Sequence, residues 1–486
     1  MSDSVHQLRH ATVRGVVSLV SRNLAIRGLG LIGNIALARL LTPDDFGAIA
    51  LGLTLSQIGI ALVSGGVTAS IARREEEPER ADLQAALAFQ VGATLAFVAV
   101  AAPAGLALGG AGPVTALMVC SLPIDALRVS NTAVAMRRLQ FGLLARAAVV
   151  ETVAFNVVAV ALVAAGMDVW GVAVANIVRA VSGTLLLFVR GPVGWLVPRW
   201  HGERLRRHLS FGAANQATVL INTGRDQGVN VVVGAVGGLA ALGVWNLAYR
   251  LLQVVLLVMQ ALWQVAFPAI ARLLEAGQSG AALMRRGVRL VAIVTGLAAA
   301  ILGGTAPAAV PVLFGPGWDG VPALLTLGAA SLMISGPITT LGFSFLWAVG
   351  SAGAVLRATI AHTVTWLAVA TALLPFIGSD AVGIGMLAAA FVVRGFLLGA
   401  IRRHIPLNDV ALTAGPTMLA VAAGAAGWLV TEAVASDALA LVLGCLATVG
   451  VFAAGVALAL RDDLRTLSRL LGGALRPRPQ PYGVPS

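Results

Sequence analysis

Seven arginines lie inside long apolar stretches, where a charged side chain costs roughly 3 kcal/mol at the centre of a membrane helix. They are Arg22, Arg27, Arg128, Arg179, Arg225, Arg250 and Arg394. The carboxylates in or near the same stretches are fewer, namely Asp125, Glu151, Asp226 and Glu432. Guanidinium groups carry a permanent charge and offer paired donors that match phosphate oxygens. The surplus of positive charge therefore predicts a hydrated interior that accepts an anionic group such as a diphosphate.

Polar side chains accompany these arginines at helical spacing. At 100° per residue, one face of the stretch 240–268 carries Asn246, Arg250, Gln253, Gln260 and Gln264. A polar face of the stretch 210–236 carries Asn215, Thr218, Asn222, Asp226 and Asn230, with Arg225 at its edge. Shorter sets at the same spacing are Asn23, Arg27 and Asn34, then Asp125, Arg128 and Asn131, then Asn176 and Arg179.

Two interpretations of these polar faces remain open. Asn and Gln side chains bridge neighbouring membrane helices, and Asp125 could form a self-contained ion pair with Arg128. For the two long faces we favour a water-filled cavity, in which arginines meet a diphosphate and amides meet sugar hydroxyls. The predicted substrate-binding residues are Arg27, Asn34, Arg128, Arg179, Asn222, Arg225, Asp226, Asn246, Arg250 and Gln253.

The composition requires a membrane-embedded scaffold for these residues. The chain has 486 residues, of which 58% are hydrophobic and 11% charged, and a mean hydropathy of +0.91. Apolar stretches of about 20 residues recur, each long enough to cross a bilayer as a helix. We predict an all-α polytopic membrane protein with about fourteen spans, at residues 16–38, 46–70, 83–105, 113–134, 146–166, 170–189, 210–236, 240–268, 288–312, 321–347, 355–377, 382–400, 410–431 and 438–460.

The charge distribution predicts the orientation of these spans. The net charge is +12, and every basic residue is an arginine. A basic balance can signal nucleic-acid binding, but here the arginines gather in the loops on one side of the predicted spans. By the positive-inside rule both termini are cytoplasmic. The tail 461–486 is expected to combine an amphipathic surface helix with a disordered Pro- and Arg-rich end.

Motifs of soluble catalysis are not found in the sequence. The chain has no lysine for a phosphate-binding loop and no His-rich or Cys-rich cluster, and Cys120 and Cys445 lie far apart within predicted spans. We therefore expect no enzymatic activity, no metal and no cofactor. A membrane glycan polymerase or ligase is less favoured, because the loops opposite the arginine-rich side are all short.

Two runs of sequence resemble a known family. Residues 38–47, Ala-Arg-Leu-Leu-Thr-Pro-Asp-Asp-Phe-Gly, resemble the first helical hairpin of bacterial oligosaccharide flippases. These flippases form the polysaccharide transport, or O-antigen translocase, branch of the multidrug/oligosaccharidyl-lipid/polysaccharide (MOP) exporter superfamily. Residues 225–250 resemble the start of the second half of such a protein. Arg27 is followed about twenty residues later by Phe46-Gly47, and Arg225 is followed at a similar distance by Leu242-Gly243. In both cases a helix with a central arginine meets a turn and then a helix that opens on a glycine. The pattern is explained either by an internal duplication, which is usual in secondary transporters, or by chance similarity among Ala-, Gly- and Leu-rich helices.

The resemblance implies two six-helix lobes around a central cavity, followed by two extra helices. The corresponding divisions are an N-terminal lobe at 1–209 that ends in a cytoplasmic loop at 190–209, a C-terminal lobe at 210–403, two helices at 404–460 and the tail 461–486.

The resemblance also implies a function in the bacterial inner membrane. The substrate would be a glycan unit linked to undecaprenyl diphosphate, flipped by alternating access for O-antigen, capsule or exopolysaccharide synthesis. Membrane lipids and the polymerase or glycosyltransferase machinery would be its partners, and nucleic acid would not. A multidrug or cation antiporter is one alternative, although a carboxylate-rich interior would be expected there, and a lipid II flippase is another.

Overall fold

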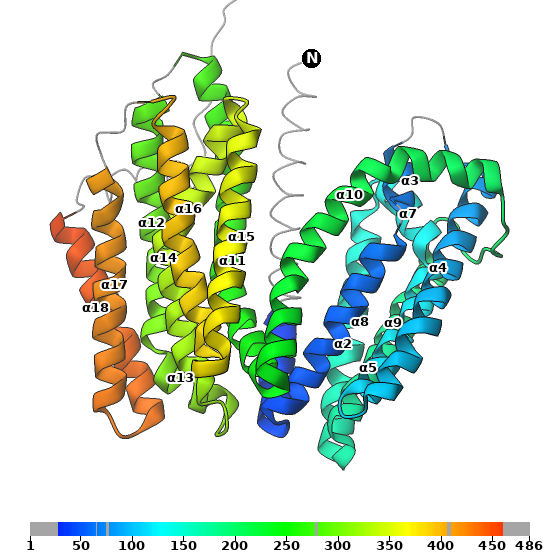
Figure 1. Ribbon diagram of the computed structural model, residues 1–486, viewed down its shortest axis with the longest axis horizontal. Helices are drawn as coiled ribbons and strands as arrows, with labels where there is room; N and C mark the ends of the chain where they lie inside the picture. The colour runs from blue at the N-terminus through cyan, green and yellow to red at the C-terminus, as the bar shows by residue number, and fades with distance from the viewer. Residues whose placement is uncertain (1–27, 65, 74–76, 278–279, 406–409, 460–486) are drawn as a thin grey trace, which may run out of the picture. The chain divides into compact units, whose positions relative to one another are not determined.

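The computed structural model describes residues 28–64, 66–73, 77–277, 280–405 and 410–459, and every regular element in these ranges is a helix (Figure 1). The prediction of an all-α polytopic membrane protein is confirmed. Arg22, Arg27 and the predicted tail helix lie outside the described residues. The chain divides into two compact units, residues 1–246 and 247–486, which are described separately below. The lobe boundaries expected from sequence stay predictions.

The first unit consists of helices of very different length. After the helix Gly28–Leu40 they are α2 (Pro43–Val63), α3 (Val67–Arg73), α4 (Arg80–Leu108), α5 (Gly112–Val119), α6 (Leu122–Ala126), α7 (Val129–Arg137), α8 (Phe141–Leu162), α9 (Asp168–Arg190) and α10 (Gly202–Val232). The helix α11 (Gly238–Glu275) begins in the first unit and continues into the second.

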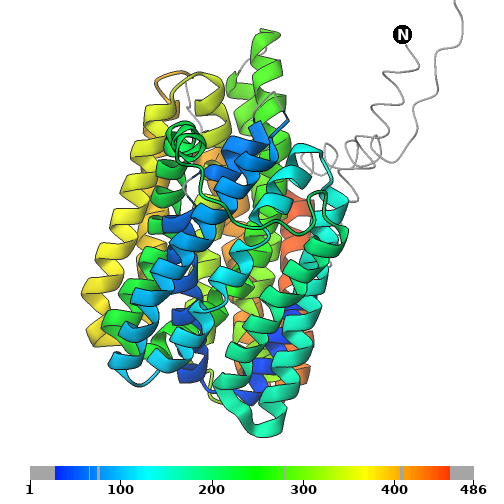
Figure 2. The same cartoon turned by 90° about the vertical axis from the view of Figure 1, so that its right-hand side faces the viewer.

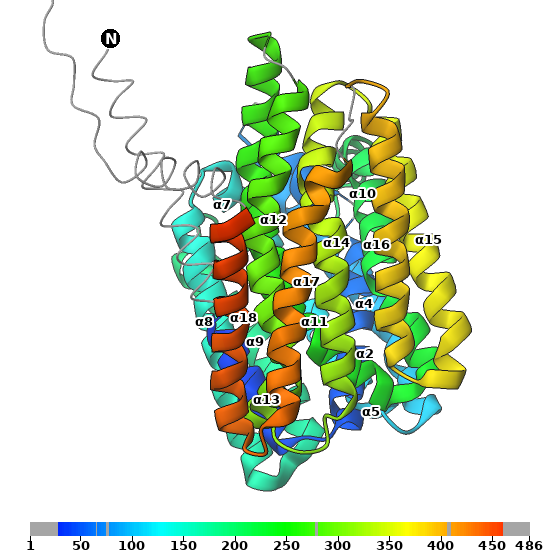
Figure 3. The same cartoon turned by 90° about the vertical axis from the view of Figure 1, so that its left-hand side faces the viewer.

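The second unit continues with α12 (Gly280–Gly304), α13 (Ala306–Phe314), α14 (Gly320–Ala348), α15 (Ala352–Ile377), α16 (Asp380–Ile401), α17 (Val410–Ala433) and α18 (Asp437–Ala459). Helices α12, α14, α15 and α16 contribute side chains to a common apolar core, and Figure 3 shows where these helices lie. Phe345, Leu397 and Ile401 are fully buried in it. Hydroxyl groups on α14 donate to carbonyls of their own helix, as Ser344 does to Thr340 over 2.8 Å. A helix with several polar residues can therefore be buried.

Within the described residues, nine helical segments are long and apolar enough to cross a membrane, or ten if a pair bent by 52° counts as one span. Two of the nine, Phe141–Arg190 and Val219–Glu275, are 50 and 57 residues long. At 1.5 Å per residue the shorter would reach about 75 Å, well beyond the roughly 30 Å of a bilayer core. A π-helical turn interrupts each, η1 (Val163–Met167) and η2 (Val233–Gly237). The number fourteen stays a prediction.

The first of these long segments folds back on itself. Gly166 has φ 88°, which ends α8 and redirects the chain. Helices α8 and α9 then lie side by side, in teal in Figure 2. A single predicted span, 113–134, is by contrast divided into α5, α6 and α7, with the bend of 52° between α6 and α7.

The start of α2 is determined by local sequence. Thr42 caps the helix, Pro43 occupies its first turn, and Asp45 completes a capping box. The Asp45 amide donates to Thr42 Oγ1 over 3.3 Å, and the Thr42 amide donates to Asp45 Oδ2 over 3.0 Å. These bonds satisfy amides that a helix leaves unpaired at its N-terminus.

Gly47 and Gly243, the two glycines that the sequence pattern pairs, meet within the first unit. A Cβ atom on Gly47 would overlap the carbonyl oxygen of Leu239, and one on Gly243 would overlap that of Pro43. In each helix the glycine lies four residues after the carbonyl that the other glycine faces: Gly47 follows Pro43, and Gly243 follows Leu239. The two contacts are therefore equivalent. Equivalent turns of α2 and α11 therefore cross backbone to backbone, a packing that only small residues permit.

Candidate functional site

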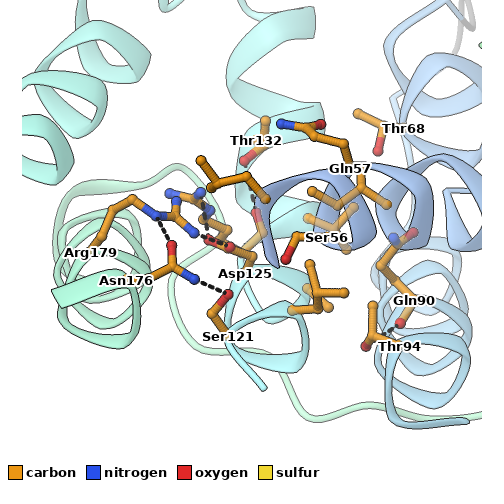
Figure 4. A pocket seen from close by; sticks show the side chains of 16 residues that line it. Ser56, Gln57, Thr68, Gln90, Thr94, Ser121, Asp125, Thr132, Asn176 and Arg179 are labelled. Carbon is orange, nitrogen blue, oxygen red and sulfur yellow. Dashed lines mark hydrogen bonds and ion pairs between the residues drawn. The ribbon is translucent and has the colours of Figure 1, made fainter. Parts of the chain in front are cut away.

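A cavity of about 440 Å³ lies within the first unit, between α2, α4 and the segments α6, α7 and α9 (Figure 4). Apolar side chains such as Leu53 and Ile60 form part of its wall. The polar residues that line it are Ser56, Gln57, Thr68, Gln90, Thr94, Ser121, Asp125, Arg128, Thr132, Asn176 and Arg179. Two predicted substrate-binding arginines, from different helices, are thus brought to one cavity.

Four charged side chains form a closed network at one side of this cavity. Arg128 donates to Asp125 Oδ1 over 2.7 Å and forms a short ion pair with Glu151. Arg179 donates to Asp125 Oδ2 over 2.8 Å and to Glu151 Oε2 over 3.2 Å. Each guanidinium contacts both carboxylates, and each carboxylate contacts both guanidiniums. We call these four residues the ion-pair cluster.

The broken span and one glycine make room for the ion-pair cluster. Arg128 lies at the break before α7 with φ −91° and ψ 1°, so its side chain leaves the chain where α6 ends. Asp125 belongs to α6, Glu151 to α8 and Arg179 to α9. Gly183 lies one turn after Arg179. A Cβ atom at this position would overlap the Glu151 and Arg128 side chains, so glycine leaves the space that they occupy. Four helical segments therefore converge on one point.

A buried asparagine joins the cluster to the neighbouring helix. Asn176 Oδ1 accepts from Arg179 Nε over 3.0 Å, while its Nδ2 donates to Ser121 Oγ over 3.0 Å and to the Met118 carbonyl over 3.1 Å. The Arg179 guanidinium is held by three partners in a fixed orientation. Asn176 is 4% exposed, so these bonds replace those it would make to water.

The ion-pair cluster carries no net charge, because two guanidiniums face two carboxylates. Opposite charges at these distances stabilise one another strongly where water is scarce, and leaving one unpaired is costly. Arg128 and Arg179 therefore add no surplus positive charge to the cavity. Among the described residues, no group of three or more His, Cys, Asp or Glu side chains is placed to hold a metal ion.

The polar face of α10 contains both exposed and packed residues. Asn222, Arg225 and Asp226 are exposed, and Arg225 Nε donates to Asp226 Oδ1 over 2.8 Å. Asn230 instead donates to Thr54 Oγ1 over 3.0 Å and accepts from Trp245 Nε1 over 2.8 Å. The helix-bridging interpretation thus describes Asn230, while Asn222, Arg225 and Asp226 present exposed polar groups on the same helix.

The remaining predicted residues are distributed over other helices. Asn34 donates to the Gly30 carbonyl over 2.8 Å, and Asn246 donates to the Leu242 carbonyl over 3.0 Å. Arg250 is half-buried and Gln253 is exposed on α11. Arg394, an intramembrane arginine outside the predicted substrate-binding set, donates to the Ile334 carbonyl over 2.9 Å. A substrate-binding role for these residues stays a prediction.

Several residues of the ion-pair cluster and of the cavity were not singled out from sequence. Glu151 was counted among the carboxylates of the spans but given no role, and Gln57, Gln90 and Thr94 were not considered. Gln90 and Thr94 are four residues apart, so they share a face of α4. That spacing within an apolar span was the signal that could have found them.

Comparison with known proteins places this architecture among membrane transporters. A search of curated proteins found no match to the sequence. Among solved structures, the fold is similar to that of "Lipid II flippase MurJ, inward closed conformation", with a TM-score of 0.70 and 13% identity over 92% of this chain and 100% of that one. An inward-facing multidrug resistance MATE family transporter of the MOP superfamily aligns with a TM-score of 0.56 and 17% identity over 79% of this chain and 98% of its own. A MOP superfamily transporter from Pyrococcus furiosus Vc1 gives a TM-score of 0.50 and 18% identity over 79% of this chain and 95% of its own.

These similarities define the class: a multi-pass membrane protein with the fold of MOP superfamily transporters. Residues 36–322 match the family described as "Polysaccharide biosynthesis protein", which is more than half of the 486 residues. The chain belongs to this polysaccharide biosynthesis protein family. The predicted relationship to a polysaccharide family is thereby confirmed, and the fold is similar to that of MOP superfamily transporters.

Proposed function

We propose that this protein flips a lipid-linked oligosaccharide, a glycan unit on undecaprenyl diphosphate, across the bacterial inner membrane. It would serve O-antigen, capsule or exopolysaccharide synthesis and would act as a transporter without catalysing a reaction. Both termini would be cytoplasmic. The polymerase or glycosyltransferases that use the same lipid would be its partners.

Family membership is the observation that carries this proposal. The matched region, residues 36–322, contains the ion-pair cluster, the cavity and the exposed polar face of α10. A protein of polysaccharide biosynthesis with a transporter fold must handle a substrate whose lipid part prefers the bilayer and whose sugar part prefers water. Carrying the sugar part across requires polar groups at membrane depth.

The exposed residues of α10 are the proposed contacts for the diphosphate. Arg225 is 44% exposed at its side chain and is paired with Asp226. A diphosphate offers more acceptor oxygens than one carboxylate, and Arg matches them bidentately. Asn222 is exposed on the same helix and could bind a neighbouring hydroxyl. Arg27, Asn34, Asn246, Arg250 and Gln253 stay individually predicted substrate contacts. Arg128 and Arg179 would position the wall of the first-unit cavity, which both line.

Reconstitution in liposomes tests the proposal. Purified protein is incorporated into vesicles that contain a fluorescent undecaprenyl diphosphate oligosaccharide, and access of a membrane-impermeant quencher reports flipping. We expect faster flipping than in empty vesicles. Neutralising Arg27, Arg225 or Arg250 with Gln should abolish flipping while membrane insertion is retained, and full activity of all three variants would contradict the proposed roles.

Assays with two other substrates distinguish the proposed function from lipid II transport and from multidrug export. Vesicles that contain lipid II, and vesicles loaded with a cationic dye, are assayed with the same preparation. Preference for lipid II would replace the proposal with peptidoglycan precursor transport. Dye efflux without lipid flipping would indicate a multidrug antiporter.

A further inference from the structure

Three hydroxyl groups that line the first-unit cavity are left as hydrogen-bond acceptors. Ser56 Oγ donates to the Gly52 carbonyl over 2.8 Å, Thr94 Oγ1 to the Gln90 carbonyl over 2.8 Å, and Thr132 Oγ1 to the Arg128 carbonyl over 3.0 Å. Each hydroxyl proton is thus used within its own helix. The oxygen lone pairs that remain can accept from a ligand.

Gln90 adds a buried acceptor without a partner. The residue is 9% exposed, and its Oε1 accepts no hydrogen bond from any side chain or backbone group of the described residues. An unsatisfied buried carbonyl costs about 1–3 kcal/mol. Because Gln90 lines the cavity, a donor bound there would remove this cost.

The charges around the cavity restrict which donor can bind. Asp125, Arg128 and Arg179 line it, and Asp125 already accepts from both guanidiniums. A cation would be repelled by the two guanidiniums, and the one carboxylate that lines the cavity is already neutralised by them. A phosphate would meet the acceptor oxygens of the opposite wall. A neutral, hydroxyl-rich group avoids both conflicts and supplies the donors.

We propose that the first-unit cavity binds a neutral sugar residue of the transported glycan, with Gln90 Oε1 and Thr94 Oγ1 as acceptors for its hydroxyl groups. This inference rests on the proposed function and names the part of the substrate that the cavity takes. The volume of about 440 Å³ lies in the range of small-molecule sites. The apolar wall at Leu53 and Leu122 offers a surface for the hydrophobic face of a sugar ring.

Two water-soluble probes separate the sugar from the diphosphate. Purified protein is titrated with inorganic diphosphate and with the disaccharide diphosphate headgroup of a lipid that the wild type flips. For Gln90→Leu and Thr94→Val we expect the headgroup Kd to rise about tenfold, the loss of one buried hydrogen bond. The Kd for inorganic diphosphate should stay unchanged. Thr94→Ser retains the hydroxyl and should restore headgroup binding.

Thr115→Val is the matched control. Thr115 Oγ1 is also buried without a partner among the described residues, yet it does not line the cavity. We expect this variant to bind both probes as the wild type does.

Each remaining outcome contradicts the site. If the wild type flips the lipid but Gln90→Leu and Thr94→Val bind the headgroup normally, the sugar site is wrong and the transport function stands. Equal weakening for both probes would likewise overturn the site. If the wild type flips no sugar-bearing lipid and binds no headgroup, both proposals fall.

Discussion

The intramembrane arginines Arg128 and Arg179 differ from Arg225, in the same unit, in exposure and in the number of carboxylates that they contact. Arg128 and Arg179 are held in the ion-pair cluster, where side-chain exposures are 16–26%. Arg225 on α10 has a side chain 44% exposed and pairs only with its neighbour Asp226, which is 54% exposed. The first group contacts two carboxylates per guanidinium, and the second contacts one.

The difference shows that the exposure of a guanidinium group determines how its charge is compensated. A buried guanidinium must be compensated within the protein, because the surroundings solvate it poorly. An exposed one can exchange a weak neighbour for a ligand at little cost. The cluster therefore has the properties of a positioning element, while the α10 face has those of a binding surface.

Glu151→Gln should have the largest effect on stability. It leaves two part-buried guanidiniums, with side chains 18% and 26% exposed, sharing one carboxylate. Loss of one partner from a fully buried ion pair costs about 3–5 kcal/mol, which is the upper limit of the expected change. Unfolding in detergent, followed by tryptophan fluorescence, measures the change. Glu77→Gln is the control, because the Glu77 pair with Arg138 is exposed at 3.4 Å and should contribute under about 1 kcal/mol. Equal stability of the two variants would show that the cluster needs no compensation.

Gly183→Ala should have an intermediate effect. The added methyl group would overlap the Glu151 carboxylate and the Arg128 guanidinium, and overpacking of this kind costs about 1–3 kcal/mol. Gly92→Ala on α4 meets no atom within 4 Å, so the same substitution should be neutral or slightly stabilising there. The same unfolding assay compares them. A Gly183→Ala protein as stable as the wild type would mean that the cluster can shift.

Arg225→Gln should change stability least and transport most. An exposed pair of neighbours contributes little, so unfolding should shift by less than about 0.5 kcal/mol. Loss of a charge-assisted contact to diphosphate should abolish lipid flipping. Arg146→Gln, an exposed arginine on α8, controls for charge alone and should flip normally. Strong destabilisation by Arg225→Gln would place Arg225 with the buried group instead.

Much of the architecture could be predicted from local patterns. Apolar runs of membrane length predict spanning helices because lipid leaves the backbone no other way to satisfy its hydrogen bonds. The start of α2 followed from Thr42, Pro43 and Asp45, which act within one turn. The break at Arg128 was not predicted, since the run 113–134 has the composition of a continuous span and its bend of 52° depends on packing.

The candidate site was only partly predictable for the same reason. Spacing indicated that Asp125 and Arg128 could pair, because residues three apart share a helix face. Spacing could not indicate that Arg179 of α9 and Glu151 of α8 belong to the same network. Arg179 contacts Asp125 over 2.8 Å and Glu151 over 3.2 Å. Nor could spacing indicate that Gln90, from α4, lines the same cavity.

By itself, then, the sequence determined that the chain is a helical membrane protein with more positive than negative charge in its spans. Hydropathy and charge are sums over residues and need no knowledge of neighbours. Only the tertiary structure decided which arginines are part-buried against two carboxylates and which are paired at an exposed face that a ligand can reach. Coulomb energies depend on distances of a few ångströms between residues that are distant in sequence, and packing alone determines those distances.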